Sequence, residues 1–235
     1  MTRAILPERV IERIRSERLR PRPTQWDYLH LVGLRDALAN AFRTIDLVPG
    51  PVLDLYCGTR PYDSLIPRRP VWGMDRDRHF GRADVLSDLP LPFPDQTFAA
   101  ILCTQALYLV DDPEATVTEM HRVLAPGGYA VVTVPHIFRR ELATERRYSP
   151  AQLAAMFGAW AHVSVTGIGG PGTGLAFFPG SVAGAVARHF KPARLALPFV
   201  SLAINGAGWA MEKALSPLAG RWPASLIAVA RRSDS

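Results

Sequence analysis

The chain has 235 residues, 48% of them hydrophobic and 20% charged, which suits one α/β domain with an elaboration and excludes wholesale disorder. The net charge is +6, but the basic residues are almost all arginines dispersed among acids, so charge alone selects neither a nucleic acid nor a membrane as partner. The two cysteines, Cys57 and Cys103, lack metal-ligand spacing and are predicted to be free thiols in a reducing compartment.

The first predicted elements are two helices. Apolar residues spaced among charges predict an amphipathic helix over residues 7–19, and Arg20-Pro-Arg-Pro23 ends it. A second helix follows, with Thr24 as its candidate cap and an apolar face that runs from Leu31 to Phe42. Because residues 1–20 are charged throughout and contain no apolar stretch, we expect no secretory signal.

Strands and helices then alternate along the chain. Strands are predicted at 52–56, 71–74, 83–86, 98–103, 129–134, 162–168 and 224–231. Helices are predicted over 113–124, with Asp112 as the cap, and over 150–158, entered through Tyr148-Ser-Pro150. This alternation is typical of a parallel sheet with helices on both faces.

The segment between the last two strands is longer than an α/β domain requires. It contains a predicted glycine-rich loop from Gly167 to Gly174 and two apolar helices near 176–190 and 194–215. Residues 195–211 carry no charge, but this run is shorter than the about 20 apolar residues of a membrane span. Four basic residues flank it: Lys191, Arg194, Lys213 and Arg221. We therefore predict a lid over an apolar acceptor, an element on an anionic bilayer surface, or an ordinary helical cap on the sheet.

Two strand ends predict a nucleoside-binding half-site. The strand Val52–Leu55 breaks into a tight turn around Gly58, and the strand that begins at Val71 ends in Asp75. The glycine lets backbone approach a ligand, and an acid at this distance can accept hydrogen bonds from both ribose hydroxyls.

With these elements in order, the chain resembles the class I S-adenosylmethionine-dependent methyltransferases, in particular the type 11-like group that acts on small molecules and lipids. The resemblance is carried by VLDLYCGTRPY (52–62), VWGMD (71–75), ADVLSDLPLPFPDQTFAAILC (83–103), LVDDPEATVTEMHRVLAPGGYAVVTVP (109–135) and RRYSPAQLAAMF (146–157). It implies an α/β, Rossmann-like seven-stranded sheet, mostly parallel with an antiparallel last strand. We expect one domain, 1–235, with N-terminal helices (1–48), a cofactor-binding core (49–169), a helical insertion (170–222) and a closing strand with tail (223–235).

The resemblance also implies roles for residues that would bind S-adenosylmethionine. Asp54 matches the acid that orders the glycine loop and meets the cofactor's ammonium through water, and Gly58 matches the glycine beneath the methionine part. Asp75 matches the acid that holds the ribose. Asp88 matches the acid that accepts from the adenine amino group, with Asp84 as the competing candidate.

The chain departs from the family pattern in the glycine loop. Tyr56 and Arg60 stand where the family has its first and third glycines, so we expect positive φ and close backbone approach to be limited there. Tyr56 adds bulk where the methionine chain runs, and Ala99 replaces the acid of the usual Phe-Asp pair. These departures motivate an alternative, a non-catalytic methyltransferase-fold protein that serves as a binding or scaffold module.

Catalysis of methyl transfer mainly requires that donor and acceptor be held in line, with a base for a hydroxyl acceptor. Cys103, at the end of the fourth strand, lies where the donor faces the acceptor in the family. His136 and Tyr108, just past the fifth and fourth strands, are the candidate catalytic residues, with Asp111 as a further candidate. If His136 has no catalytic role, it is interpreted as a solvated loop histidine. His121 is interpreted as a surface or packing residue. No metal is expected.

The sequence thus predicts a methyltransferase for an apolar, lipid-linked or glycan acceptor. It is expected to be cytoplasmic or peripheral at the inner face of the membrane, with membrane contact through residues 176–215. An RNA methyltransferase is disfavoured because no appended RNA-binding motif is present. The signature Asn/Asp-Pro-Pro-Tyr/Phe of base methylation is also missing after the fourth strand.

Overall fold

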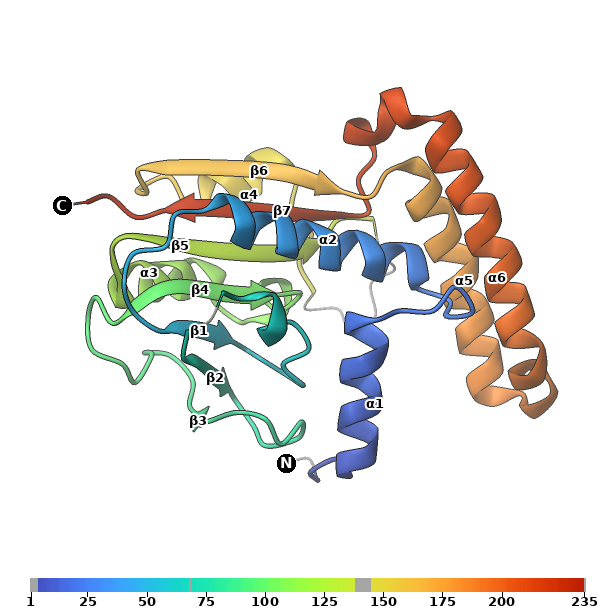
Figure 1. Ribbon diagram of the computed structural model, residues 1–235, viewed down its shortest axis with the longest axis horizontal. Coiled ribbons are helices and arrows are strands. Elements are labelled where there is room, and N and C mark those ends of the chain that lie inside the picture. The colour runs from blue at the N-terminus through green and yellow to red at the C-terminus, as the bar shows by residue number, and fades with distance from the viewer. Residues whose placement is uncertain (1–3, 68, 138–144, 235) are drawn as a thin grey trace.

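The computed structural model describes residues 4–67, 69–137 and 145–234 and has a seven-stranded sheet at its centre (Figure 1). The strands are β1 (Val52–Leu55), β2 (Val71–Asp75), β3 (Val85–Leu86), β4 (Phe98–Thr104), β5 (Leu124–Pro135), β6 (His162–Ile168) and β7 (Ser225–Arg231). Their order in the sheet is β3-β2-β1-β4-β5-β7-β6. Only β7 runs against its neighbours in this sheet, pairing antiparallel with both β5 and β6. The predicted sheet, mostly parallel with an antiparallel last strand, is confirmed.

Helices cover both faces of this sheet. They are α1 (Glu8–Leu19), α2 (Tyr28–Thr44), α3 (Pro113–Val123), α4 (Pro150–Ala155), α5 (Pro171–His189) and α6 (Lys191–Ala214), with short 3-10 turns η1 (Asp63–Leu65), η2 (Leu107–Leu109) and η3 (Ser216–Arg221). Because side chains alternate along a strand, Leu53 and Leu55 of β1 face the core shared with α3 and α4, whereas Val52 faces the core under α2. Each face of the sheet is therefore closed by its own apolar cluster.

The helix starts follow the sequence in two of three cases. Asp112 accepts a hydrogen bond from Ala115 N at 2.8 Å and caps α3 as predicted. Ser149 begins α4 in a reciprocal capping box with Gln152. The predicted cap Thr24 is wrong, because α2 begins only at Tyr28, with Asp27 before it and no capping bond from that side chain. The residues before Asp27 are instead held by the C-terminal helices, since Asn205 Nδ2 donates to the carbonyls of Pro23 and Gln25.

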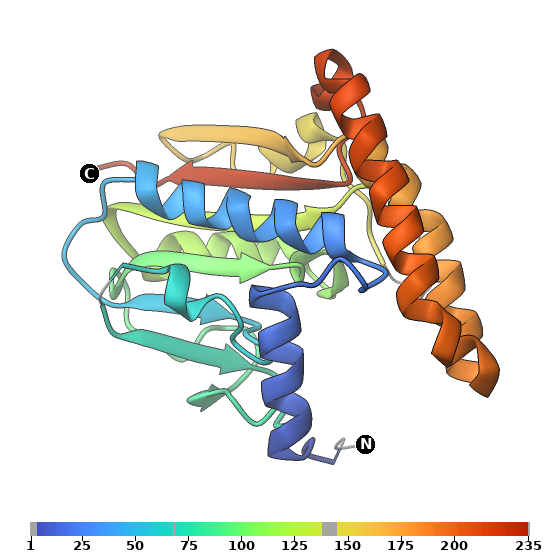
Figure 2. The same ribbon diagram turned by 45° about the vertical axis from the view of Figure 1, so that its right-hand side comes forward.

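The long insertion is a helical hairpin of α5 and α6. Figure 2 shows it beyond the end of the sheet toward which the parallel strands point, with α1 standing upright beside the ends of β1 and β2. The predicted loop from Gly167 to Gly174 is wrong: Gly167 belongs to β6 and α5 starts at Pro171. No helix in the described ranges is both long and apolar enough to cross a membrane. The division of the chain at residues 48, 169 and 222 stays a prediction.

Candidate functional site

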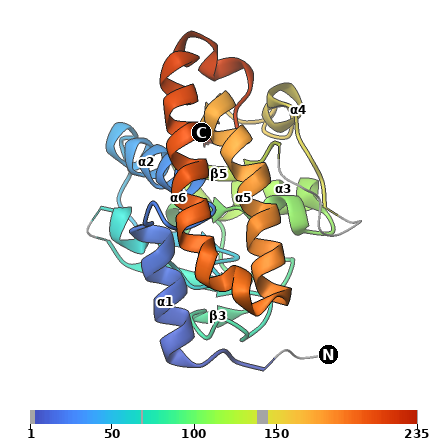
Figure 3. The ribbon, with the colours of Figure 1, turned by 90° about the vertical axis from the view of Figure 1, so that its right-hand side faces the viewer.

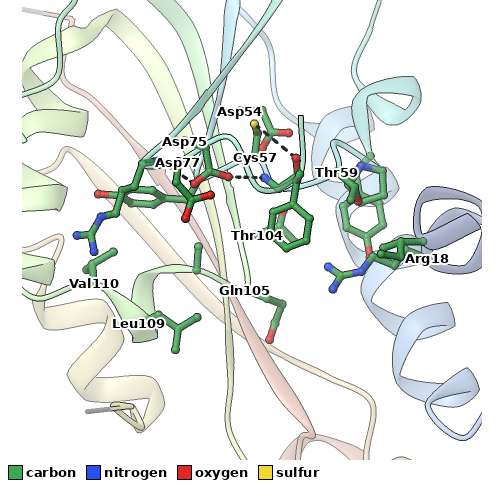
Figure 4. A pocket seen from close by; sticks show the side chains of 18 of the residues that line it. Arg18, Asp54, Cys57, Thr59, Asp75, Asp77, Thr104, Gln105, Leu109 and Val110 are labelled. Atoms are coloured by element: carbon green, nitrogen blue, oxygen red, sulfur yellow. Dashed lines mark hydrogen bonds between the residues drawn. The ribbon is translucent and has the colours of Figure 1, made fainter. Parts of the chain in front are cut away.

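A cavity of about 630 Å³ opens at the carboxyl ends of β1, β2 and β4. Its walls come from four segments: Asp54 with the loop up to Tyr62, residues 75–80, residues 104–110, and the inner face of α1. Figure 4 shows Asp54 and Asp75 at the strand ends, with Arg18 of α1 facing the same space from the other side. In open α/β sheets, ligands bind outside the carboxyl ends of the strands, at the point where the strand order reverses.

The loop after β1 keeps a left-handed backbone at three alternate residues. φ is 57° at Tyr56, 53° at Gly58 and 52° at Arg60. The expectation that Tyr56 and Arg60 limit positive φ is therefore wrong. A left-handed conformation costs an L-residue about 1–2 kcal/mol, so the surrounding contacts must hold these two residues in place.

Arg60 supplies most of those contacts. Its guanidinium donates to Asp63 at 2.8 Å, to Asp84 at 2.7 Å and to the Val71 carbonyl at 2.8 Å. Gly73 in β2 leaves room for it, since a Cβ there would lie 2.9 Å from Arg60 Cδ. The Arg60 side chain thus does not line the cavity but joins the loop to β2 and to the segment before β3.

Tyr56 is held differently and does line the cavity. Its ring packs against the core cluster under α3, and the Arg76 guanidinium lies 5.4 Å from the ring centroid. Burial raises the pKa of the Tyr56 hydroxyl. The predicted bulk at this position is present, and it forms a wall of the cavity.

Asp75 links the loop to the cavity. One carboxylate oxygen accepts from Gly58 N at 3.0 Å and the other from Arg76 N at 2.8 Å. Burial raises the pKa of Asp75, and these two amide hydrogen bonds oppose the shift. The acid that was expected to hold a ribose therefore also positions the loop glycine.

Asp54 is the most deeply buried acid of the site, with 4% of its surface exposed. Burial, together with the nearby charge of Asp63, raises the pKa of Asp54 well above its ordinary value. Gly58 N donates to Asp75 and not to Asp54, so the role of Asp54 in ordering the loop stays a prediction. Asp54 offers a carboxyl group to the floor of the cavity.

The two acids considered for adenine differ in their surroundings. Asp84 is engaged by Gly73 N at 2.8 Å and by Arg60, so its carboxylate serves the strand pair β2–β3. Asp88 does not line the cavity, and its carboxylate lies 3.2 Å from Nε of Arg76, which does. Asp88 therefore reaches the site only through Arg76.

Cys103 lies outside the cavity as well. Its side chain is fully buried in the core under α3 and α4, and burial raises its pKa to about 12. The next residues, Thr104, Gln105 and Ala106, line the cavity instead. The sequence placed the strand end one residue too early: β4 continues through Thr104. Gln105 then turns the chain with φ 52°.

Of the two candidate catalytic residues, one lines the cavity and the other does not. Tyr108 lines the cavity, with the Arg147 guanidinium 5.5 Å from its ring centroid. His136 lies outside the cavity lining, and its Nδ1 is 2.9 Å from the Tyr148 carbonyl oxygen. Asp111 is 89% exposed at its side chain and lies 3.5 Å from Arg76.

His121 packs edge-on against Trp160, with ring centroids 5.2 Å apart, as expected of a packing residue. In the described part of the chain no cluster of His, Cys, Asp or Glu could hold a metal ion. Both cysteines are free and buried.

Sequence reasoning missed Arg18 and Ile14 of α1, which line the cavity. Among the described residues Arg18 makes no ion pair, although it faces a site that contains Asp54 and Asp75 (Figure 4). The signal was its spacing, since Ile11, Ile14 and Arg18 fall on one face of the helix. The helix is held across the cavity by Arg82, which pairs with Glu8 and Glu12.

Parts of the chain are similar to known methyltransferases. A family model described as a methyltransferase domain matches residues 71–132, from β2 into β5. Over 98 residues the chain is 36% identical to the ubiquinone/menaquinone biosynthesis C-methyltransferase UbiE of Desulfotalea psychrophila, which covers 35% of this chain and 40% of that protein. The chain thus matches less than half the length of this curated relative.

Solved structures share the fold at low identity. The 4+2 cyclase SpnF is 20% identical with a TM-score of 0.58, covering 88% of this chain and 83% of that one. Phosphoethanolamine N-methyltransferase 2 of Haemonchus contortus, solved with phosphomonomethylethanolamine and S-adenosylhomocysteine, is 13% identical with a TM-score of 0.54, covering 85% of this chain and 52% of that one. In its sheet order, its matched domain and these relatives, the chain is similar to the class I S-adenosylmethionine-dependent methyltransferases.

Proposed function

We propose that this protein is an S-adenosylmethionine-dependent methyltransferase that acts on a small molecule. The observation that carries the proposal is the Asp75 carboxylate, which fixes the loop at Gly58 and faces a cavity of about 630 Å³ at the carboxyl edge of the sheet. That is where a nucleoside binds in open α/β folds.

The residues around the cavity fit the charges of the cofactor. Asp75 is suited to the ribose hydroxyls, and the buried Asp54 carboxyl to the α-ammonium group. Arg18, which enters from α1 without an ion-pair partner among the described residues, suits the α-carboxylate. Gly58 and Tyr56 border the methionine part, Arg60 holds the loop in shape, and Asp88 orients Arg76. We leave Cys103 and Asp84 out of this set.

Bound S-adenosylmethionine supplies an activated methyl group on a sulfonium. The protein then has to bring an acceptor into line and exclude water. Tyr108 is our candidate for contacting the acceptor, because it lines the cavity beyond the end of β4. His136 is our candidate base: with Nδ1 donating to the Tyr148 carbonyl, the neutral ring carries its lone pair on Nε2.

The acceptor we propose is apolar, lipid-linked or a glycan on such a carrier. Two observations support an apolar group: the named role of the Desulfotalea relative in quinone biosynthesis, and the apolar hairpin beyond the end of the sheet at which the cavity opens (Figure 2). We place the protein in the cytoplasm or at the inner face of the membrane, with contact to the bilayer surface through residues 176–215.

A second candidate is a binding or scaffold module that keeps the fold without methyl transfer. Tyr56, Arg60 and Ala99 favour it, since all three depart from the family pattern. The neighbour named as a 4+2 cyclase indicates that this fold alone does not fix the reaction.

Transfer of a labelled methyl group from S-adenosylmethionine to lipid and aqueous metabolite extracts tests the proposal. We expect labelled product in the lipid extract with the wild type, none with Asp75→Ala, and undiminished product with Trp72→Ser, an exposed residue of β2 that does not line the cavity. His136→Asn and Tyr108→Phe then test the acceptor side. Cofactor binding without any transfer to either extract would support the binding module.

A further inference from the structure

The α5–α6 hairpin has large apolar side chains on its outside and small or polar ones on its inside. The exposed set is Leu175, Phe178, Val182 and Val186 on α5, and Leu195, Phe199, Leu202 and Trp209 on α6. Phe178 is 63% exposed and Phe199 75%. The buried set is Gly172, Ala176, Gly180 and Gly184 on α5, and Ser201, Asn205 and Gly208 on α6. A helix that packs in water shows the opposite arrangement.

The inner side is held to the protein by close backbone contact and hydrogen bonds. A Cβ on Gly172 would lie 2.1 Å from the Gly208 carbonyl oxygen, so the two helices touch through their backbones. Glu212 accepts from Thr173 N at 2.8 Å, and Asn205 donates to the chain before α2. The outer side chains are therefore not needed to hold the hairpin in place, and an apolar surface of this extent marks a docking face.

Figure 3 looks at this face: α5 and α6 lie side by side in front of the remaining fold. Residues 171–187 and 195–211 carry no Asp, Glu, Lys or Arg. Arg188 lies in the last turn of α5, and Lys191 and Arg194 lie in the first turn of α6. Lys213 lies at the far end of α6, with its ammonium 5.0 Å from the Trp209 ring centroid. The single acid between 171 and 215 is Glu212, which is engaged with Thr173.

This charge pattern distinguishes between two partners that could cover the outer face of the hairpin, an anionic bilayer and a second copy of the chain. An apolar face with cations at both ends and no free acid complements an anionic bilayer, where the side chains enter the acyl region and the cations meet headgroups. A second copy of this chain would bring the same cations and no acid to pair with them. Helices that meet through small residues and show large apolar ones outward are also typical of a lipid environment.

We propose that the outer face of the α5–α6 hairpin docks in the plane of an anionic lipid bilayer. Both helices lie parallel to the surface, so that Phe199 near the turn and Trp209 near the base reach the same depth. The proposal deepens the membrane contact of the proposed function by naming the face, the lipid charge and the orientation. It rests on that function for the acceptor alone, since docking requires neither cofactor nor methyl transfer.

Co-sedimentation of the full chain with vesicles tests the docking. We expect binding to vesicles of mixed phosphatidylcholine and phosphatidylglycerol, and much weaker binding to phosphatidylcholine alone.

The double variant Phe178→Ser with Phe199→Ser lowers the partition coefficient by at least about tenfold, because two large apolar side chains no longer enter the bilayer. Arg188→Gln with Lys191→Gln lowers it by about thirtyfold on anionic vesicles. Arg194 is left intact because it caps α5 through the carbonyls of Ala187 and Arg188. Trp72→Ser, an exposed aromatic change on β2, leaves the partition coefficient unchanged.

Quenching of tryptophan fluorescence by brominated lipids tests the orientation. We expect quenching on anionic vesicles that is largely lost in Trp209→Phe. Absence of wild-type binding to anionic vesicles overturns the proposal, as does a wild-type dimer that Phe178→Ser with Phe199→Ser turns into a monomer. A protein that binds vesicles but no S-adenosylmethionine contradicts the proposed function and leaves the docking intact.

Discussion

The cofactor half of the sheet and the C-terminal hairpin bury opposite kinds of side chain. In the first, Leu53 and Ile101 are fully buried and the polar groups gather at one cavity. In the second, Ser201 and Asn205 are buried while Phe199 is 75% exposed. The sheet half is arranged for water outside and a polar ligand within, whereas the hairpin is arranged for an apolar neighbour outside. One chain therefore carries two surfaces of opposite character.

The two regions also differ in where they contain features that disfavour the folded state. At the cavity these features are confined to single residues: Tyr56 and Arg60 have positive φ, and the carboxyl group of Asp54 is buried. In the hairpin the unfavourable feature is an apolar face that is exposed to water and extends over both helices. The first cost is offset by neighbours inside the fold, and the docking that we propose would offset the second with lipid.

The largest effect is expected at the inner contact of the hairpin. Gly172→Ala places a Cβ 2.1 Å from a backbone oxygen and lowers the free energy of unfolding by about 3 kcal/mol. Gly206→Ala is the matched control: a Cβ there meets nothing within 4 Å, so it raises that free energy by up to about 1 kcal/mol through helix propensity. Urea unfolding measures both. Equal effects would mean that the helices do not meet through their backbones.

The next effect concerns the buried acid of the cavity. Because the folded pKa of Asp54 lies above its unfolded value, the stability it contributes is present at acidic pH and is lost as pH rises through the folded pKa. Asp54→Asn is therefore more stable than the wild type at pH 7, because the amide never ionises, and the difference shrinks toward pH 4. It also binds cofactor more weakly. Thermal unfolding between pH 4 and pH 8 checks this, and a pH-independent difference would contradict it.

A smaller effect is expected for the cation that α1 brings to the cavity. Arg18→Gln weakens binding of S-adenosylmethionine by about tenfold, the size of one charge-assisted hydrogen bond. Arg13→Gln, on the exposed side of the same helix beside Glu17, leaves the dissociation constant unchanged. Titration calorimetry compares them. Equal affinities in both variants would remove Arg18 from the site.

The smallest effect separates backbone strain from side-chain contacts in the loop. Arg60→Ala and Arg60→Gly both lose the guanidinium's hydrogen bonds, but glycine accepts the φ of 52° without strain. The glycine variant should therefore be more stable than the alanine variant by about 1 kcal/mol in urea unfolding. An alanine variant that is as stable as the glycine variant would show that the loop relaxes once Arg60 is removed.

Sequence patterns were sufficient where the physics is local. Alternating apolar runs predicted the strands, and Asp112 and Ser149 sit at helix starts because their side chains bond amides three residues away. Sequence patterns failed where residues far away in the sequence determine the local conformation. The left-handed backbone at Arg60 depends on Asp84, 24 residues further along the chain, and the start of α2 depends on Asn205.

The site was predicted in outline for the same reason. Asp54 and Asp75 lie at the carboxyl ends of strands and Gly58 follows one, so the sequence shows all three directly, and all three line the cavity. Cys103 was misplaced because only the true end of β4 reveals that Thr104 is the next residue to face the cavity. Arg18 comes from a helix whose position over the cavity is set by Arg82, far away in sequence.

Calorimetric titration with S-adenosylmethionine and S-adenosylhomocysteine tests the central claim most directly. We predict micromolar dissociation constants for the wild type, loss of binding in Asp75→Ala, and unchanged binding in Asp36→Ala, an exposed acid of α2 that does not line the cavity. Folded wild-type protein that takes up neither compound at millimolar concentration would contradict the account.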